Sequence, residues 1–114
     1  MPYVSLHTGA TLPASLKQNI ARDLGEIVTV IPGKNVGNLM IAFQDGTDMV
    51  FAGSATDKCI YMDIKLHGAA AQEAKTKLVE STCAMLVKYT GITAENIYIT
   101  VQEFPNWGAL GKYL

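Results

Sequence analysis

The sequence of 114 residues predicts an α+β fold, in which two repeated strand–helix–strand units form one four-stranded mixed sheet with two helices on one face. Three observations predict it. A shift of 58 residues aligns residues 39–45 with 97–103 without a gap. An amphipathic helical pattern precedes each aligned stretch, and a strand-like run precedes each helix. We therefore expect a single domain over residues 1–114, made of pseudo-repeats at about 1–57 and 58–114.

The first half consists of a predicted strand at residues 3–8, a helix that ends before Gly33, and a strand at residues 39–45. Thr11 ahead of Pro13 is typical of a helix start, and Gly33 after Pro32 is typical of a helix end. Spacings of three and four residues place one apolar stripe on this helix: Leu16, Ile20, Leu24, Ile27 or Val28, and Ile31. We expect this stripe to cover the sheet.

The second half repeats the design, with a predicted strand at residues 59–67, a helix between Gly68 and Gly91, and a strand at residues 97–103. Its helix carries a matching stripe: Ala74, Leu78, Thr82 or Cys83, Met85 or Leu86, and Tyr89. Within each half, the two strands should be parallel and joined by a right-handed crossover, because a helix lies between them.

The segments outside the repeated units are predicted to be a turn, a short strand and an apolar tail. Residues 44–48 have the composition of a turn, and residues 49–54 that of a short edge strand ending in a bend. We expect the aromatic tail, residues 104–114, to pack on a neighbouring subunit. We also expect the sheet face away from the helices to be apolar and covered by a partner. That expectation rests on Met40, Ala42, Ile60, Met62, Ile64, Ile97, Ile99 and Val101.

Composition favours a homo-oligomer, because 49% of the residues are hydrophobic and only 17% are charged. The net charge is -1 and the cations are scattered, which disfavours nucleic-acid binding. No apolar run approaches the roughly 18 residues of a membrane span and no signal peptide is evident, so no membrane association and a cytoplasmic location are expected. Cys59 and Cys83 lack metal-ligand or redox spacing, so we expect no metal site and two small buried residues.

Pro2 is the most informative single residue, because it follows Met1 directly and opens the first strand. Removal of Met1 would make Pro2 a secondary amine at the mouth of a strand. A buried amine with a lowered pKa is suited to act as a general base. The alternative is a proline that lies at the terminus without a catalytic role, and the residue alone does not decide between them.

The ordered set of Pro2, Gly33-Lys34, residues 49–54, residues 96–99 and residues 106–108 resembles the macrophage migration inhibitory factor branch of the tautomerase superfamily. The resemblance spans nearly the whole chain. It implies a homotrimer with active sites at subunit interfaces, Pro2 as catalytic base, keto–enol tautomerisation of aryl α-keto acids such as phenylpyruvate, and no cofactor. It also implies an alternative: a cytokine-like binding protein with a weak or vestigial site, exported without a signal peptide to an unknown receptor.

The resemblance also implies roles for individual side chains. Lys34 would bind the substrate carboxylate and keep the amine of Pro2 neutral, and Tyr98 would reach the pocket entrance from an adjacent subunit. His67 would contribute its main-chain amide, with the role of its side chain left open. Phe104 and Trp107 would form the slot for the substrate ring or would seal the interface. The alternatives are a helix-end lysine, a packing tyrosine and a surface histidine.

The sequence departs from the family pattern in two places. Thr100 stands where relatives have an asparagine that contacts substrate, so Thr100 leaves substrate preference open. Cys59 is not part of a C-x-x-C motif, so thiol oxidoreductase activity is not expected. Gly53 and Ser54 align with residues that line the site in relatives. Isomerisation of a dicarboxylate ranks last among the activities, because Arg22 is the only arginine.

Overall fold

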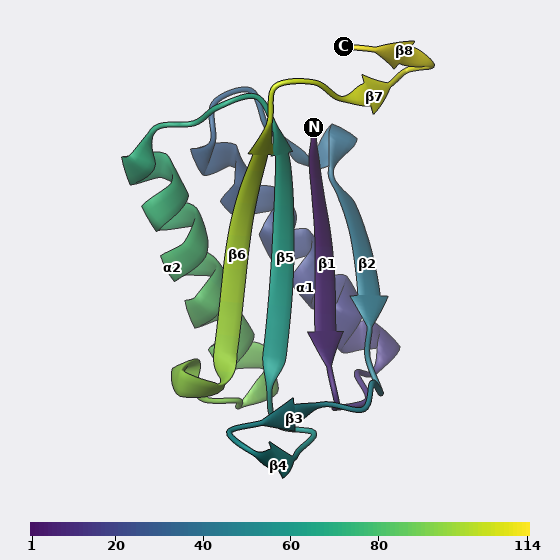
Figure 1. Cartoon of the computed structure of the whole chain (residues 1–114), viewed down its shortest axis with the longest axis vertical. Coiled ribbons are helices and arrows are strands. Elements are labelled where there is room, and N and C mark those ends of the chain that lie inside the picture. Colours follow the sequence, from purple (N-terminus) through teal and green to yellow (C-terminus); the bar gives the residue numbers. More distant parts are fainter.

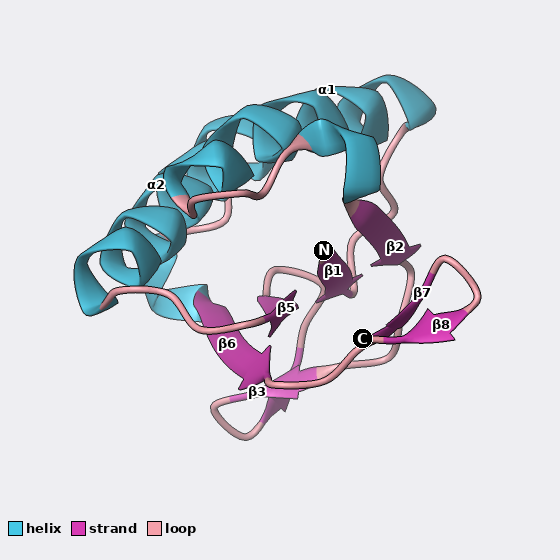
Figure 2. Ribbon diagram, turned by 90° about the horizontal axis from the view of Figure 1, so that it is seen from above, coloured by secondary structure: helices cyan, strands magenta, loops and turns pink.

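The computed structural model describes all residues 1–114 and contains one four-stranded sheet. Its strands are β1 (Pro2–Thr8), β2 (Met40–Gln44), β5 (Ile60–His67) and β6 (Ile97–Phe104), in the order β2-β1-β5-β6. β1 is parallel to β2 and β5 is parallel to β6, whereas the central pair is antiparallel. The helices α1 (Ala14–Ile27) and α2 (Gln72–Thr90) lie together on one face of the sheet (Figures 1 and 2). The predicted α+β fold is confirmed.

The first helix ends earlier than predicted, although its apolar stripe is confirmed. Ile20 and Leu24 are fully buried, and Val28 continues the stripe in a short 3₁₀ turn, Val28–Val30. The α-helix therefore stops at Ile27, whereas the sequence placed its end near Gly33. Pro32 accounts for part of the difference, because a proline disfavours helical geometry in the residue before it.

The second helix follows the prediction closely. Three residues of this helix are fully buried: Leu78, Thr82 and Leu86. Gly91 ends the helix in the left-handed conformation, with φ of 73°, and its N–H donates to the carbonyl oxygen of Val87 at 2.9 Å. Neither helix has the combination of length and apolar character needed to cross a bilayer.

The sheet face away from the helices is mixed in character, so the prediction of an apolar face there is wrong. Most of the residues assigned to it pack in the core on the helix side: Ile60, Met62, Ile64, Ile97, Ile99 and Val101. Side chains alternate along a strand, and the helices cover the apolar set. Met40 and Ala42 are the two assigned residues outside that core.

Hydrogen-bonded polar side chains occupy the open face instead. Ser5 Oγ lies 2.9 Å from Nε2 of His7 on β1. Tyr61 Oη lies 2.7 Å from Oγ1 of Thr100, which in turn donates to Asp63 at 3.3 Å. These polar groups share the open face with the exposed side chains of Met40 and Tyr98, so the face is mixed in character.

Two small ribbons lie at opposite ends of the sheet (Figure 1). β3 (Val50–Phe51) pairs with β4 (Ser54–Ala55) in a separate hairpin, so the predicted edge strand at 49–54 does not join the main sheet. The tail forms the second ribbon, in which β7 (Gly108–Ala109) pairs with β8 (Lys112–Tyr113). Two further 3₁₀ turns, Val36–Asn38 and Ala94–Asn96, precede β2 and β6.

Both cysteines are free thiols. Cys59 is buried, as predicted, and its Sγ lies 4.0 Å from Sδ of Met49. Cys83 is only half-buried, on the face of α2 that packs against the core.

Candidate active site

The start of β1 is fixed at the end of the sheet that carries the C-terminal ribbon (Figure 1). Pro2 is buried and lies opposite Leu66 in the antiparallel pairing of β1 with β5. The carbonyl oxygen of Met1 accepts a hydrogen bond from the main-chain N–H of His67 at 3.2 Å. The residues at the N-terminus are therefore held by the sheet.

A cavity of about 510 Å³ opens beside this terminus. Six of its nine lining residues are hydrophobic, and they come from β1, the approach to β2 and the C-terminal ribbon. The lining residues are Met1, Pro2, Tyr3, Asn38, Met40, Trp107, Gly108, Ala109 and Leu110. Its size and mainly apolar walls suit a small organic ligand with an apolar group.

Lys34 brings a cation to the same terminus. Its Nζ donates to the carbonyl oxygen of His67 at 2.6 Å. The turn that carries it is closed by a hydrogen bond from the N–H of Lys34 to the carbonyl oxygen of Ile31 at 3.0 Å. Gly33 has φ of +82° in this turn, a conformation that glycine adopts without strain. This turn therefore places Lys34 beside His67 near the N-terminus, although Lys34 does not itself line the cavity.

The environment of the terminus favours an uncharged amine. The pKa of the Met1 amine is lowered from 8.0 to about 6. Burial is the largest cause, and the hydrogen bond with Lys34 and the like charge of Lys34 are the second and third. About nine-tenths of an amine with this pKa is neutral at pH 7. While Met1 is attached, the nitrogen of Pro2 is a tertiary amide without a basic lone pair. The lowered pKa is therefore that of the Met1 amine, which directly precedes Pro2 in the chain.

An aromatic cluster borders the cavity. The ring of His67 stacks on Trp107, with centroids 6.1 Å apart and planes at 25°. Phe104 meets the same indole edge-on at 5.9 Å and 65°. Trp107 lines the cavity, whereas His67 and Phe104 do not, so these two rings support the indole from outside the cavity.

The structure gathers five of the predicted site residues at one end of the protomer: Pro2, Lys34, His67, Phe104 and Trp107. It does not bring Tyr98 and Thr100 to them. The strand register places Tyr98 five residues and Thr100 three residues along β5 from Leu66, which is about 17 Å and 10 Å. Gly53 and Ser54 lie in the ribbon at the opposite end of the sheet, where Tyr98 packs 5.6 Å from Phe51.

Of the nine residues that line the cavity, sequence reasoning had named only Pro2 and Trp107 as site residues. One signal was available for two of the others. Tyr3 follows Pro2 directly, and the parallel pairing of the first two strands places Met40 beside Tyr3. The contribution of the tail ribbon at Ala109 and Leu110 had no comparable signal, because the position of the ribbon depends on tertiary contacts.

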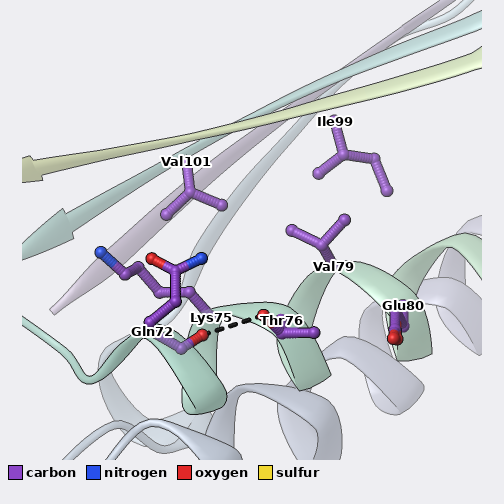
Figure 3. A pocket seen from close by; sticks show the side chains of 7 residues that line it. All are labelled: Gln72, Lys75, Thr76, Val79, Glu80, Ile99 and Val101. Carbon is purple, nitrogen blue, oxygen red and sulfur yellow. Dashed lines mark hydrogen bonds between the residues drawn. The ribbon is translucent and has the colours of Figure 1, made fainter.

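A second cavity, of about 430 Å³, lies between α2 and β6 and contains no evident chemistry (Figure 3). Its lining consists of Gln72, Lys75, Thr76, Val79, Glu80, Ile99 and Val101. The ammonium of Lys75 is paired with Glu103 at 2.8 Å, and the hydroxyl of Thr76 donates to the carbonyl oxygen of Gln72 at 3.0 Å. No group of three metal-ligating side chains occurs in the chain. The candidate site is therefore the cavity at the N-terminus.

Comparisons with known proteins show the family to which the chain is similar. The family model described as macrophage migration inhibitory factor matches residues 1–112. The crystal structure of MIF2 from Leishmania major is 25% identical, with a TM-score of 0.90, and the match covers 100% of this chain and 97% of that one. A macrophage migration inhibitory factor homologue from Prochlorococcus marinus is 26% identical, with a TM-score of 0.78 and 97% coverage of both chains.

The same fold also occurs in more distant proteins. A member of the cis-3-chloroacrylic acid dehalogenase family is 17% identical, with a TM-score of 0.83, and the match covers 99% of this chain and 82% of that one. At this identity the likeness extends to the fold only. No curated protein sequence matches the chain significantly.

Proposed function

The chain belongs to the macrophage migration inhibitory factor family, and we propose that it is a cofactor-independent keto–enol tautomerase of phenylpyruvate-like α-keto acids. One observation carries the proposal. With Met1 attached, burial and Lys34 lower the pKa of the terminal amine to about 6, and Met1 and Pro2 both line an apolar cavity. A general base is most effective when its pKa lies near the working pH.

In the proposed reaction, removal of Met1 makes the nitrogen of Pro2 the terminal amine. It also frees the N–H of His67, which the Met1 carbonyl otherwise occupies at 3.2 Å. The ammonium of Lys34 binds the substrate carboxylate, because a charged hydrogen bond is stronger than a neutral one. The free N–H of His67 is then a donor for a substrate oxygen beside it.

In the proposed reaction one proton moves from the substrate to Pro2 and back to the substrate. The neutral amine removes a proton from the carbon next to the carbonyl group, and the electron pair of that C–H bond forms the carbon–carbon double bond of the enol. The protonated amine then returns its proton to the carbonyl oxygen. Lys34 favours the neutral state of the resting amine by its like charge, and its attraction for negative charge stabilises the enolate that develops in between. The apolar cavity accommodates the aryl group.

We also propose that the protein is a homotrimer with the site completed by a neighbouring subunit. Large hydrophobic side chains are exposed in the protomer, among them Met40 (67%), Tyr98 (61%), Leu110 (84%) and Tyr113 (80%). Two of these, Met40 and Leu110, border the cavity itself. Tyr98 can contribute to a site only in a neighbouring subunit, because it lies far from the cavity of its own subunit. Native mass spectrometry should give three chains per particle, and a fully active monomer would contradict this arrangement.

The alternative is a binding protein with a vestigial pocket, and one observation favours it. The hydroxyl of Thr100 is engaged with Tyr61 and Asp63 on its own sheet, so it does not replace the missing asparagine amide. Kinetics separate the two functions. An intact assembly that carries a free Pro2 amine and turns over no α-keto acid would support the binding protein.

The test compares three chains whose N-termini are checked by mass spectrometry. The first is methionine-free protein, the second carries Pro2→Gly, and the third has one alanine inserted before Pro2 so that its nitrogen is an amide. We expect turnover of phenylpyruvate to fall at least about tenfold in the second and third chains. Equal melting temperatures serve as the folding control. Unchanged turnover in both altered chains would refute the proposal.

A further inference from the structure

The C-terminal ribbon supplies almost half of the residues that line the candidate site, yet it has no hydrogen bond to the rest of the protein. Residues 107–110 all border the cavity. The main-chain bonds of Trp107 go to Leu114, at 2.7 and 3.3 Å, and the side chain of Asn106 also donates to Leu114. The remaining pairing joins β7 to β8. Every hydrogen bond of residues 106–114 thus stays within that segment.

An aromatic contact joins the ribbon to the sheet. The indole of Trp107 stacks on the imidazole of His67, with centroids 6.1 Å apart and planes at 25°, and Phe104 meets it edge-on. Phe104 is itself the residue that leads into the tail, whereas His67 belongs to the central strand β5. His67 is therefore the part of this cluster that is fixed independently of the tail.

His67 is held firmly enough to serve as a support. It pairs with Phe104 in the register of β5 and β6. Its carbonyl oxygen accepts a hydrogen bond from Lys34 at 2.6 Å, a contact that does not depend on Met1. The backbone of His67 thus contacts the proposed carboxylate-binding lysine, while its side chain stacks on Trp107, which lines the cavity.

We propose that His67 is a positioning residue: its imidazole stacks behind Trp107, holds the C-terminal ribbon in place as one wall of the cavity, and thereby sets the preference of the site for an aryl ligand. The aryl preference rests on the proposed function, whereas the stack itself does not. Aromatic pairs contribute beyond the area that they bury, which corresponds to about a three- to tenfold change in affinity.

Composition makes the first experiment specific, because the chain has one tryptophan and two histidines. The fluorescence emission of Trp107 in the whole protein, recorded at one fixed pH, should change in His67→Ala, because the indole loses its stacking partner. The emission should be unchanged in His7→Gln, a matched control in which the other histidine is replaced. An emission spectrum of His67→Ala identical to that of the unaltered protein would overturn the stack.

The second experiment measures binding by calorimetry and needs no turnover. The probes are 3-phenylpropanoate and hexanoate, two carboxylates of which only the first has a ring. His67→Ala should weaken binding of 3-phenylpropanoate about three- to tenfold and leave hexanoate unchanged, and His67→Phe should restore the aryl preference. Equal weakening of both probes, or no preference in the unaltered protein, would overturn the proposal. A protein that shows this pattern but no tautomerase activity would retain the positioning role and lose the proposed function.

Discussion

Replacement of Lys34 with glutamine tests how the site keeps its amine uncharged. Lys34 is the one cation that acts on the terminal amine, through a hydrogen bond and through its charge. Burial is the largest single cause of the shift from 8.0 to about 6, so the pKa in Lys34→Gln should rise without reaching 8.0. A rise of about one unit would reduce the neutral fraction at pH 7 from about nine-tenths to about one-half.

Two kinetic effects follow and are separable. The ionisation effect should lower turnover at pH 7 about twofold and should vanish above about pH 8, because the amine is then neutral in both proteins. Loss of the charged hydrogen bond to the carboxylate should raise KM about ten- to a hundredfold at every pH. In the processed chain the amine belongs to Pro2, which pairs with Leu66 next to His67, the residue that holds Lys34, and we expect both effects to have the same direction there.

The assay is the pH profile of kcat/KM on phenylpyruvate, which reports the ionisation of the free enzyme. The acidic limb should move to higher pH in Lys34→Gln and stay in place in Lys77→Gln. Lys77 is an exposed lysine on α2, and its replacement removes the same charge from a distant surface. An acidic limb that does not move in Lys34→Gln would refute the electrostatic role of Lys34.

Three further predictions concern the fold that supports the site. Leu78→Ala removes a fully buried side chain and should lower the free energy of unfolding by about 2 to 5 kcal/mol in urea titrations; a loss below about 1 kcal/mol would mean that the helix does not pack as described. Gly91→Ala places a side chain at φ of 73° and should cost about 1 kcal/mol in thermal unfolding, whereas an unchanged melting temperature would argue against the left-handed helix end. The hydrogen bonds from Lys75 and from the N–H of Ala70 lower the pKa of Glu103, so its stabilising effect is complete above its ordinary value of 4.5 and is lost as the pH falls below it. The stability difference between the unaltered protein and Glu103→Gln should therefore shrink between about pH 6 and 3, and a constant difference would contradict that contact.

Features that repeat along the chain were predictable from the sequence. The stripe through Ile20 and Leu24 has the helical period, and only one face of such a helix can be buried. Gly91 follows the last turn of the second helix, where a left-handed residue is the common way to end it. The shift of 58 residues then required that both halves have the same order of elements.

Features that depend on which elements meet were not predictable in the same way. Alternation in residues 60–66 shows that one side of the strand is apolar, but Ile60 and Ile64 were assigned to the wrong face. The alternation of apolar residues does not show which face of the sheet the helices cover. The stack of His67 on Trp107 joins residues 40 positions apart through a ribbon whose position follows from tertiary contacts. Pro2 was singled out by its position between Met1 and the first strand and Lys34 by resemblance, whereas Met40 required the strand register.

A nitrogen NMR titration of methionine-free protein labelled with ¹⁵N-proline would test the state of the base without reference to any substrate. The other prolines, Pro13, Pro32 and Pro105, are amides, so only the nitrogen of Pro2 titrates. We predict a pKa at least about one unit below that of an unstructured peptide beginning Pro-Tyr-Val, measured alongside. A pKa equal to or above the peptide value would show that the nitrogen is charged at neutral pH and would contradict its role as the base.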